Sequence, residues 1–295
     1  MAESAADAGS AGLTAGVLTR VPGLAHGEAP LAIALLPGGS TNRNAFVRTR
    51  LSAFVVRTNL AHGARHELDR RREALLQSAA AAAGFAPEVV WADPAGAVLV
   101  SVYVPGRVWS PADIADARQL VRLGERLREL HALPAPDIVA FEAAATGRRY
   151  RGSIPARDSR DAAQLDAWVE EIAKLEVLLA AERRPRTIIH GDLHCSNVLD
   201  GGELVLVDWE YAGLADPLYD LGCILAHEPA ACSHALPLLA AAGLAGNATE
   251  ESLARAMRLY ELLSALWSRV IAAPPASGAS IGETLSGAGS GESAD

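Results

Sequence analysis

Three polar side chains occur at a spacing that suits phosphate chemistry. Asp192 and Asn197 are separated by four residues, and Asp208 follows sixteen positions after Asp192. Phosphoryl transfer needs a carboxylate that orients the attacking hydroxyl and accepts its proton, together with oxygen ligands for the magnesium that bridges the nucleotide phosphates. We therefore predict that Asp192 is the catalytic residue and that Asn197 and Asp208 are metal ligands.

The simpler alternative is that Asp192 and Asn197 only cap turns, as Asp and Asn commonly do. That reading leaves Asp208 unexplained, whereas the pattern D-x-x-x-x-N followed by a strand that ends in Asp is typical of kinases. His190 is expected to brace this loop by hydrogen bonding, and His194 and Cys195 are expected to be bystanders.

A second group of polar residues lies in the N-terminal half. A glycine turn between two predicted strands offers backbone N–H groups and hydroxyls to a phosphate; its residues are Gly38, Gly39, Ser40, Thr41 and Asn42. Arg57 ends the next strand and Glu73 follows on a helix, the order in which kinases place the cation and the acid that hold the phosphates. Taken alone, both features also fit a plain hairpin turn and ordinary solvated charges.

Arginine must supply any phosphate clamp in this chain, because Lys174 is the only lysine. The adjacent Arg70, Arg71 and Arg72 are expected to be solvated surface charges.

The elements that position these residues differ between the two halves of the chain. Strands are expected at 31–36, around Phe46 and Val47, and at 53–57, 89–91 and 97–104, with a helix at 64–83 whose apolar face includes Leu75 and Leu76. Beyond Pro105–Gly106 the pattern changes to amphipathic helices at 111–131, 161–182, after Asp216 and at 249–273. Short strands at 187–189, 197–199 and 203–208 enclose the polar loop.

The predicted fold class is therefore α+β with two lobes: a small N-terminal lobe with an antiparallel sheet and one helix, and a larger, mainly helical C-terminal lobe. The break at Pro105–Gly106 divides a nucleotide-binding lobe at 16–104 from a catalytic and acceptor-binding lobe at 105–273. Residues 1–15 and 274–295 lack a packing pattern and are expected to be disordered tails.

Composition narrows the class of function. The 295 residues carry a formal net charge of −9, which disfavours a nucleic-acid partner. No apolar run reaches the roughly 18 residues of a membrane span, and the first 19 residues lack the positive charge that begins a secretory signal. Three cysteines without C-x-x-C spacing indicate neither a disulfide framework nor a zinc site. We expect a cytoplasmic protein that is not inserted in a membrane.

Four segments carry a resemblance to a known family: G-G-S-T-N-R-N at 38–44, V-V-R at 55–57, H-G-D-L-H-C-S-N-V-L at 190–199 and V-D-W-E-Y-A-G at 207–213. D-P-L-Y-D-L-G from Asp216 supports them. With these residues the chain resembles the choline kinase and aminoglycoside phosphotransferase superfamily, and in particular its bacterial choline/ethanolamine kinase branch, from about Val17 to Ala273.

The resemblance implies a protein-kinase-like fold that binds ATP and Mg²⁺ between its lobes. It places the adenine edge against the backbone near Val102 and Val104, and the phosphates under Gly39 to Asn42. It also implies that Asp220 braces the catalytic loop. Arg57, where aminoglycoside kinases usually carry lysine, is similar to the choline kinase branch.

For the acceptor, the family uses aromatic faces and a carboxylate, which suit a quaternary ammonium. The residues that this implies for substrate binding are Trp209, Glu210, Tyr211 and Trp267, with Tyr219 and Tyr260 in the same segments. Two positions depart from the family pattern: Ser264 replaces an aromatic residue, and His227 stands near where relatives often have an acid.

The leading hypothesis from the sequence is transfer of the ATP γ-phosphate to the hydroxyl of choline or a similar amino alcohol. Thiamine and aminoglycosides are alternative acceptors within the same enzyme class. From another class, the chain could be a nucleotide-binding pseudokinase, but such a protein has no chemical need for Asp192, Asn197 and Asp208 together.

Overall fold

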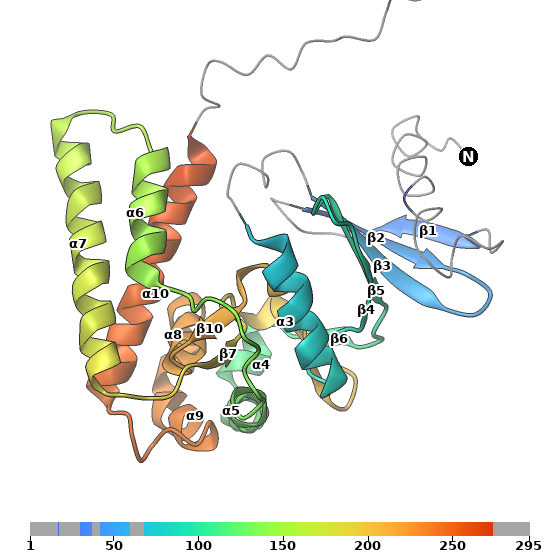
Figure 1. Cartoon of the computed structure of the whole chain (residues 1–295). Coiled ribbons are helices and arrows are strands. Elements are labelled where there is room, and N and C mark those ends of the chain that lie inside the picture. The colour runs from blue at the N-terminus through green and yellow to red at the C-terminus, as the bar shows by residue number, and fades with distance from the viewer. Residues whose placement is uncertain (1–16, 18–29, 37–41, 60–67, 274–295) are drawn as a thin grey trace, which may run out of the picture.

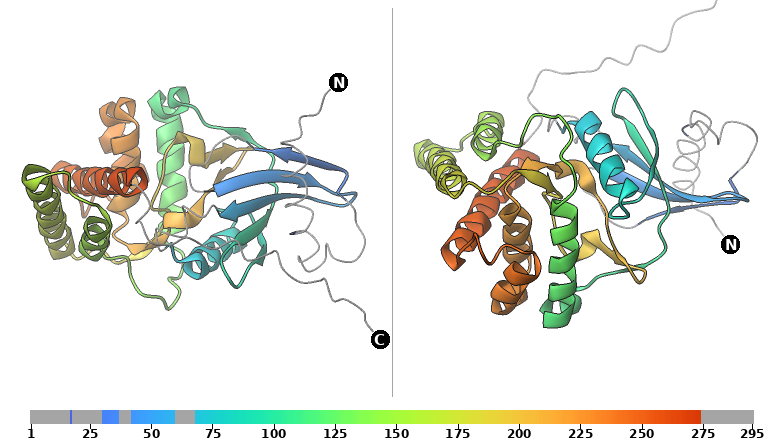
Figure 2. Two further views of the ribbon diagram at one scale, coloured as in Figure 1. Left: turned by 90° about the horizontal axis from the view of Figure 1, so that it is seen from above. Right: turned by 60° about the horizontal axis from the view of Figure 1, so that its bottom comes forward.

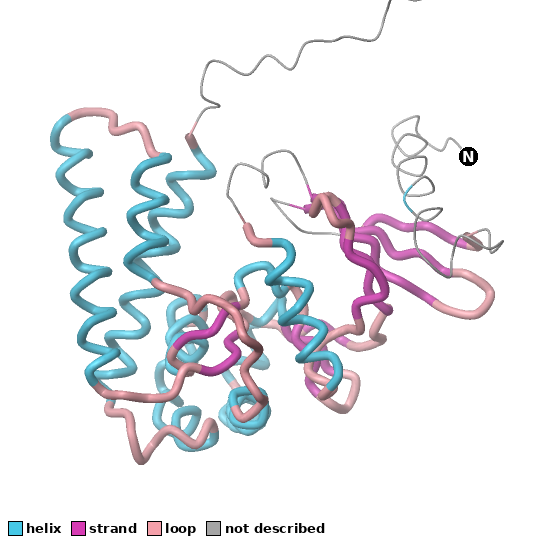
Figure 3. The backbone as a smooth tube through the Cα atoms, in the orientation of Figure 1, coloured by secondary structure: helices cyan, strands magenta, loops and turns pink. Residues whose placement is uncertain are grey.

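The computed structural model describes residue 17 and residues 30–36, 42–59 and 68–273. The predicted tails at 1–15 and 274–295, and the glycine turn at 38–41, lie outside the described residues. Strands gather at one end of the molecule and helices at the other (Figures 1 and 3).

The N-terminal part is a five-stranded antiparallel sheet in the order β1-β2-β3-β5-β4. Its strands are β1 (Ala32–Leu35), β2 (Asn42–Arg48), β3 (Ala53–Asn59), β4 (Val89–Ala92) and β5 (Val98–Val102). Phe54 and Val56 lie on the same face of β3, and with Val47 of β2 they form a small core with Val98 and Val100. The strands predicted from the sequence are confirmed.

Helix α3 (Arg70–Ala82) begins later than the predicted position 64; residues 64–67 lie outside the described part of the chain. Asp69 caps its N-terminus by accepting a hydrogen bond from the backbone N–H of Arg72. The predicted face was also wrong at Leu75, which is 46% exposed, because the buried face contains Glu73, Leu76 and Ala80 instead. Leu76 and Ala80 pack into the core of the C-terminal part, so α3 joins the two parts (Figure 1).

The C-terminal part is mainly helical, as predicted. Its helices are α4 (Pro111–Ala115), α5 (Ala117–His131), α6 (Ala143–Ser153), α7 (Ser159–Ala181), α8 (Leu218–His227), α9 (Ala235–Ala241) and α10 (Glu250–Ala272). The predicted helix at 111–131 is divided, because the backbone of Asp116 is extended and its side chain caps the start of α5. The sequence analysis assigned no helix at 143–153.

Short strands and one-turn helices hold the polar loop between these helices (Figure 2). β6 (Arg107–Val108), β8 (Val198–Asp200) and β9 (Leu204–Leu206) form one small sheet, and β7 (Thr187–Ile189) pairs with β10 (Gly213–Ala215). The 3₁₀ turns are η1 (Cys195–Asn197), η2 (Trp209–Tyr211) and η3 (Pro229–His234). The predicted β8–β9 hairpin with Gly201 and Gly202 at its tip is confirmed.

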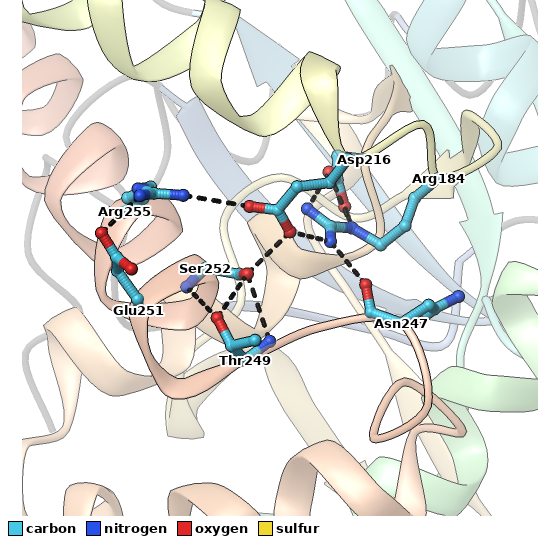
Figure 4. A network of polar contacts seen from close by, with 8 residues as sticks. Arg184, Asp216, Asn247, Thr249, Glu251, Ser252 and Arg255 are labelled. Atoms are coloured by element: carbon cyan, nitrogen blue, oxygen red, sulfur yellow. Dashed lines mark hydrogen bonds and ion pairs between the residues drawn. The ribbon is translucent and has the colours of Figure 1, made fainter.

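A polar network fixes the segment that leads into α8 (Figure 4). Arg184 donates from Nε to Asp216 at 2.9 Å and from Nη1 to the carbonyl of Asn247 at 2.9 Å. Glu182 accepts a hydrogen bond from Ser252 at 2.6 Å, at the start of α10. The end of α7 and the starts of α8 and α10 are thereby held together. No described helix combines the length and apolar character needed to cross a membrane.

Helices α8 and α10 approach so closely at Gly222 that a Cβ atom there would lie 2.6 Å from the carbonyl carbon of Ala256. We expect Gly222→Ala to lower the free energy of unfolding by about 1–3 kcal/mol, because the neighbouring atoms are backbone and cannot move aside cheaply. Gly152→Ala in α6 is the control, since its Cβ would meet nothing within 4 Å. Thermal unfolding should show a lower Tm for the first variant and an equal or higher Tm for the second; equal Tm values for both would contradict the packing argument.

Candidate active site

A cavity of about 1050 Å³ opens between the sheet and the helical part. Its wall includes Arg57 from β3, Val102 from β5, and Asp192 and Asp208 from the polar loops. The volume is at the upper end of the range for small-molecule sites, which suits two substrates bound together.

Asp220 holds the backbone of the loop that contains Asp192. This carboxylate is fully buried at the start of α8, and it accepts hydrogen bonds from the backbone N–H groups of His190 (3.1 Å) and Gly191 (2.9 Å). The Nε2 atom of His131 lies 3.0 Å from Asp220 Oδ2, the same oxygen that accepts from His190. Gly191 has φ +82 and any Cβ there would strike the carbonyl of Tyr211, so only glycine fits the turn. These contacts agree with the bracing role predicted for Asp220.

Three side chains surround the carboxylate of Asp192. The hydroxyl of Tyr260 donates to Asp192 Oδ1 at 2.8 Å, His227 Nε2 lies 3.6 Å from the same oxygen, and His194 Nε2 lies 3.8 Å from Oδ2. Burial alone would raise the pKa of Asp192, but these neighbours outweigh it and the net effect lowers the pKa. Asp192 is therefore ionised at neutral pH and ready to accept a hydrogen bond from a hydroxyl.

The same hydrogen bonds bring in residues that the sequence analysis left aside. His194 was predicted to be a bystander, but it faces Asp192, and its ring lies 5.0 Å from the ring of His227. Burial raises the pKa of Tyr260 well above its ordinary value, so its hydroxyl stays protonated and can donate to Asp192. The sequence placed Tyr260 near the acceptor but gave no sign of this bond, which joins residues 68 positions apart.

Asn197 and Asp208 face the same cavity as Asp192. The side chain of Asn197 donates from Nδ2 to the backbone carbonyl of Asp192 at 2.8 Å. The backbone carbonyl of Asn197 accepts from the N–H of Val207 at 3.0 Å. His190 Nε2 lies 2.9 Å from the carbonyl of Val207, which joins the two loops, as the predicted brace required. The structure thus brings all three predicted polar side chains to one place.

Asp208 has the chemistry expected of a cation ligand. Burial and the nearby carboxylates of Glu210, Glu73 and Asp192 raise its pKa well above the usual range, with Arg57 opposing. Its backbone is left-handed, with φ 66, a strained conformation that Asp tolerates better than most residues and that is frequent at functional sites. The excess of negative charge around Asp208 and Asn197 fits a divalent cation, which favours the ionised carboxylate.

The predicted pair of Arg57 and Glu73 is in direct contact and forms a larger network. Arg57 Nη1 also lies 3.4 Å from Asp208 Oδ1. Arg70, predicted to be a solvated charge, is instead 2.9 Å from Glu73 and 3.0 Å from Glu210. The prediction failed because the sequence does not show that Glu210 folds back against α3. Burial opposes the charge on Arg57, but the carboxylates of Glu73, Asp208 and Glu210 together outweigh burial, and the pKa of Arg57 is raised.

Only some of the remaining residues predicted to contact the nucleotide are seen to line the cavity. Gly38, Gly39, Ser40 and Thr41 lie outside the described residues. Asn42 lines the cavity, but its side chain donates to Glu210 Oε2 at 2.8 Å and accepts from Arg70. Val102 and Val104 line the cavity, and the N–H of Val102 already donates to the carbonyl of Glu88.

Of the predicted acceptor residues, Tyr211 and Trp267 line the cavity with their rings 5.8 Å apart, and Tyr150, which the sequence analysis did not select, lies 5.5 Å from Trp267. Glu210 also lines the cavity, with its carboxylate held by Asn42 and Arg70. Trp209 requires a correction: it is fully buried, donates to the carbonyl of Leu206 and packs on His190, so it supports the loop from behind.

Residues 32–260 match the protein family described as "Phosphotransferase enzyme family". The chain belongs to this family. Among solved structures, this phosphotransferase is similar to a choline/ethanolamine kinase family protein from Mesorhizobium loti, with 28% identity and a TM-score of 0.69 over 87% of this chain and 84% of the other. It is also similar to choline kinase LicA from Streptococcus pneumoniae, with 18% identity and a TM-score of 0.73 over 89% and 90%.

An aminoglycoside-3'-phosphotransferase of type VIII has 24% identity and a TM-score of 0.56 over 84% of this chain and 96% of its own. No match was found among the curated proteins. The predicted family and the protein-kinase-like α+β fold are thereby confirmed, with the sheet and one helix in the N-terminal part and helices in the C-terminal part.

Removing the Tyr260 hydroxyl tests its hold on Asp192. We expect Tyr260→Phe to lower kcat of phosphotransfer about tenfold, on the scale of one hydrogen bond to a charged group. Tyr219→Phe is the control, because the Tyr219 ring lies 5.8 Å from that of Tyr260 and, within the described residues, makes no hydrogen bond to Asp192. Steady-state kinetics that show an equal loss in both variants would assign the effect to packing.

Proposed function

We propose that this phosphotransferase transfers the γ-phosphate of ATP to the hydroxyl of choline or a related amino alcohol. The observation that supports it most is the convergence of Asp192, Asn197 and Asp208 on one cavity, beside the pair of Arg57 and Glu73. In this proposal the nucleotide lies between the sheet and the polar loops, and the chain divides into lobes at Pro105–Gly106.

Asp192 is the proposed proton acceptor for the hydroxyl of the second substrate. Its ionised carboxylate accepts a hydrogen bond from the acceptor hydroxyl and takes its proton as the oxygen bonds to the γ-phosphorus. The bond from the γ-phosphorus to the β,γ-bridging oxygen breaks, and ADP leaves with that oxygen. Asp220 keeps the loop backbone fixed through the reaction.

Asn197 and Asp208 would hold Mg²⁺, which neutralises charge on the β- and γ-phosphates when bound. Arg57, oriented by Glu73, binds the nucleotide phosphates in the place where other kinases use lysine. The turn at Gly38 to Asn42 is proposed to cover the phosphates, and the backbone at Val102 and Val104 to contact the base. Related structures support nucleotide use, since LicA is described in complex with AMP and a spectinomycin phosphotransferase with ADP.

The aromatic rings of Tyr211, Trp267 and Tyr150 support an acceptor with a cationic head, because such rings attract cations. The choline/ethanolamine kinase family protein supports the same class of acceptor. Glu210 is proposed to add negative charge to that side of the cavity, although Arg70 already offsets part of it.

The decisive measurement is ATP consumption by the purified protein with Mg²⁺ against choline, ethanolamine, thiamine and several aminoglycosides. We expect selective turnover of an amino alcohol and a fall by orders of magnitude in Asp192→Asn, because the variant loses the proton acceptor but keeps the nucleotide site. Nucleotide affinity, measured by titration, should be unchanged in the variant. Turnover of thiamine or aminoglycosides alone would assign a different acceptor to the same reaction. No turnover with any compound would refute the proposed activity.

Asp208→Asn tests the metal ligand separately. Asn also tolerates the left-handed backbone, so Tm should stay within a few degrees of the parent, while turnover falls by about a hundredfold and half-maximal activity needs more Mg²⁺. Asp192→Asn is the matched comparison, since its Mg²⁺ requirement should not change. A magnesium titration that gives the same midpoint for Asp208→Asn and the parent would contradict this role.

A further inference from the structure

The charges on the cavity wall are poorly suited to an acceptor that is only a cation. Four described carboxylates line the cavity: Glu142, Asp192, Asp208 and Glu210. Glu142 is paired with Arg186 at 2.7 Å, and Glu210 with Arg70 at 3.0 Å. The other two belong to the proposed chemistry. The acceptor side therefore has little uncompensated negative charge to offer.

Besides Arg57, two guanidinium groups line the same cavity. Arg72 comes from α3 and Arg149 from α6. Both act on Tyr150: burial raises the pKa of this tyrosine, and the charges of Arg149 and then Arg72 oppose the shift. Arg149 also lies over the Tyr150 ring, with Cζ 5.6 Å from its centroid. Arg149 thus lies at the aromatic end of the cavity, where Tyr150 contacts Trp267, and Arg72 lines the same cavity.

Arg72 has an unused donor. Its Nε atom is buried and has no hydrogen-bond partner within the described part of the chain. A buried N–H without an acceptor costs stability, because it has lost its hydrogen bond to water. A carboxylate bound here would accept from this atom, and guanidinium groups suit the planar, two-oxygen geometry of a carboxylate.

We propose that the acceptor is a hydroxylated zwitterion: an amino alcohol that also bears a carboxylate. This inference rests on the proposed function. The hydroxyl lies at Asp192, the cationic group lies against Tyr211 and Trp267, and the carboxylate is bound by Arg72 and Arg149. The competing role for the two arginines is to hold nucleotide phosphates, and the experiment below separates the two.

The test uses two pairs of probes in which one member also bears a carboxylate. Carnitine adds a carboxymethyl group to choline, and L-serine adds a carboxylate to ethanolamine. Dissociation constants are measured by calorimetric titration of the Asp192→Asn protein with ADP and Mg²⁺, so that binding is read without turnover. The same titrations are made with a double variant that carries Arg72→Gln and Arg149→Gln in addition to Asp192→Asn. Arg71→Gln and Arg148→Gln are the matched controls, since these exposed neighbours on the same two helices do not line the cavity.

We expect at least one carboxylate-bearing probe to bind about tenfold or more tightly than its partner, as a charge-assisted contact of this kind would give. The preference should fall to near one in the double variant, with ADP affinity unchanged, and should persist in the controls. The proposal would be overturned if both carboxylate-bearing probes bound equally or more weakly than their partners, or if none of the four probes bound. It would also be overturned if the preference survived the double change, or if the double variant lost affinity for ADP. Failure of the proposed function is a different result, namely no ATP consumption by the parent protein with any acceptor.

Discussion

The relative position of the sheet and the helical part depends on a set of buried charges that must neutralise one another. Arg57 on β3 and Arg70 on α3 share the carboxylate of Glu73, and Arg70 reaches on to Glu210 after β9. Ions removed from water are tolerated only when paired, and loss of one partner leaves a charge that the interior cannot solvate. The two parts of the molecule therefore cannot separate at this point without exposing or stranding charge.

Helix α3 connects this group of charges to the core of the C-terminal part. Its Leu76 and Ala80 belong to the large core of the C-terminal part, while its N-terminal turn carries the charged residues that meet the sheet. On the other side of the cavity, Asp220 holds the loop of Asp192 by its backbone, and Asn197 links that loop to the strand before Asp208. The contacts that hold this site lie behind the side chains proposed to react, which is the preorganisation that chemistry based on positioning and electrostatics requires.

The parts of this arrangement that the sequence predicted are local in the chain. Asp192 and Asn197 precede the β8–β9 hairpin and Asp208 follows it, so their spacing alone places them together. The contacts that were missed join distant residues: Arg70 with Glu210, and Tyr260 with Asp192. Trp209 shows the same limit, because its neighbours in sequence face the cavity while the 3₁₀ turn directs its own ring into the core. The strands β6 and β10, of two and three residues, were not assigned from the sequence.

The use of arginine at position 57 has a consequence for how this protein can be studied. A guanidinium stays protonated at neutral pH and is a poor nucleophile, whereas the lysine that many kinases have at the phosphates reacts readily with electrophiles. The one amine side chain, Lys174, lies on α7 with 75% of its side chain exposed, beside Glu170. Amine-directed acylating reagents that label kinases at a lysine of the nucleotide site would therefore find no lysine on the wall of this cavity, because the one lysine lies on the outer face of α7. Occupancy of the cavity would have to be followed by another chemistry.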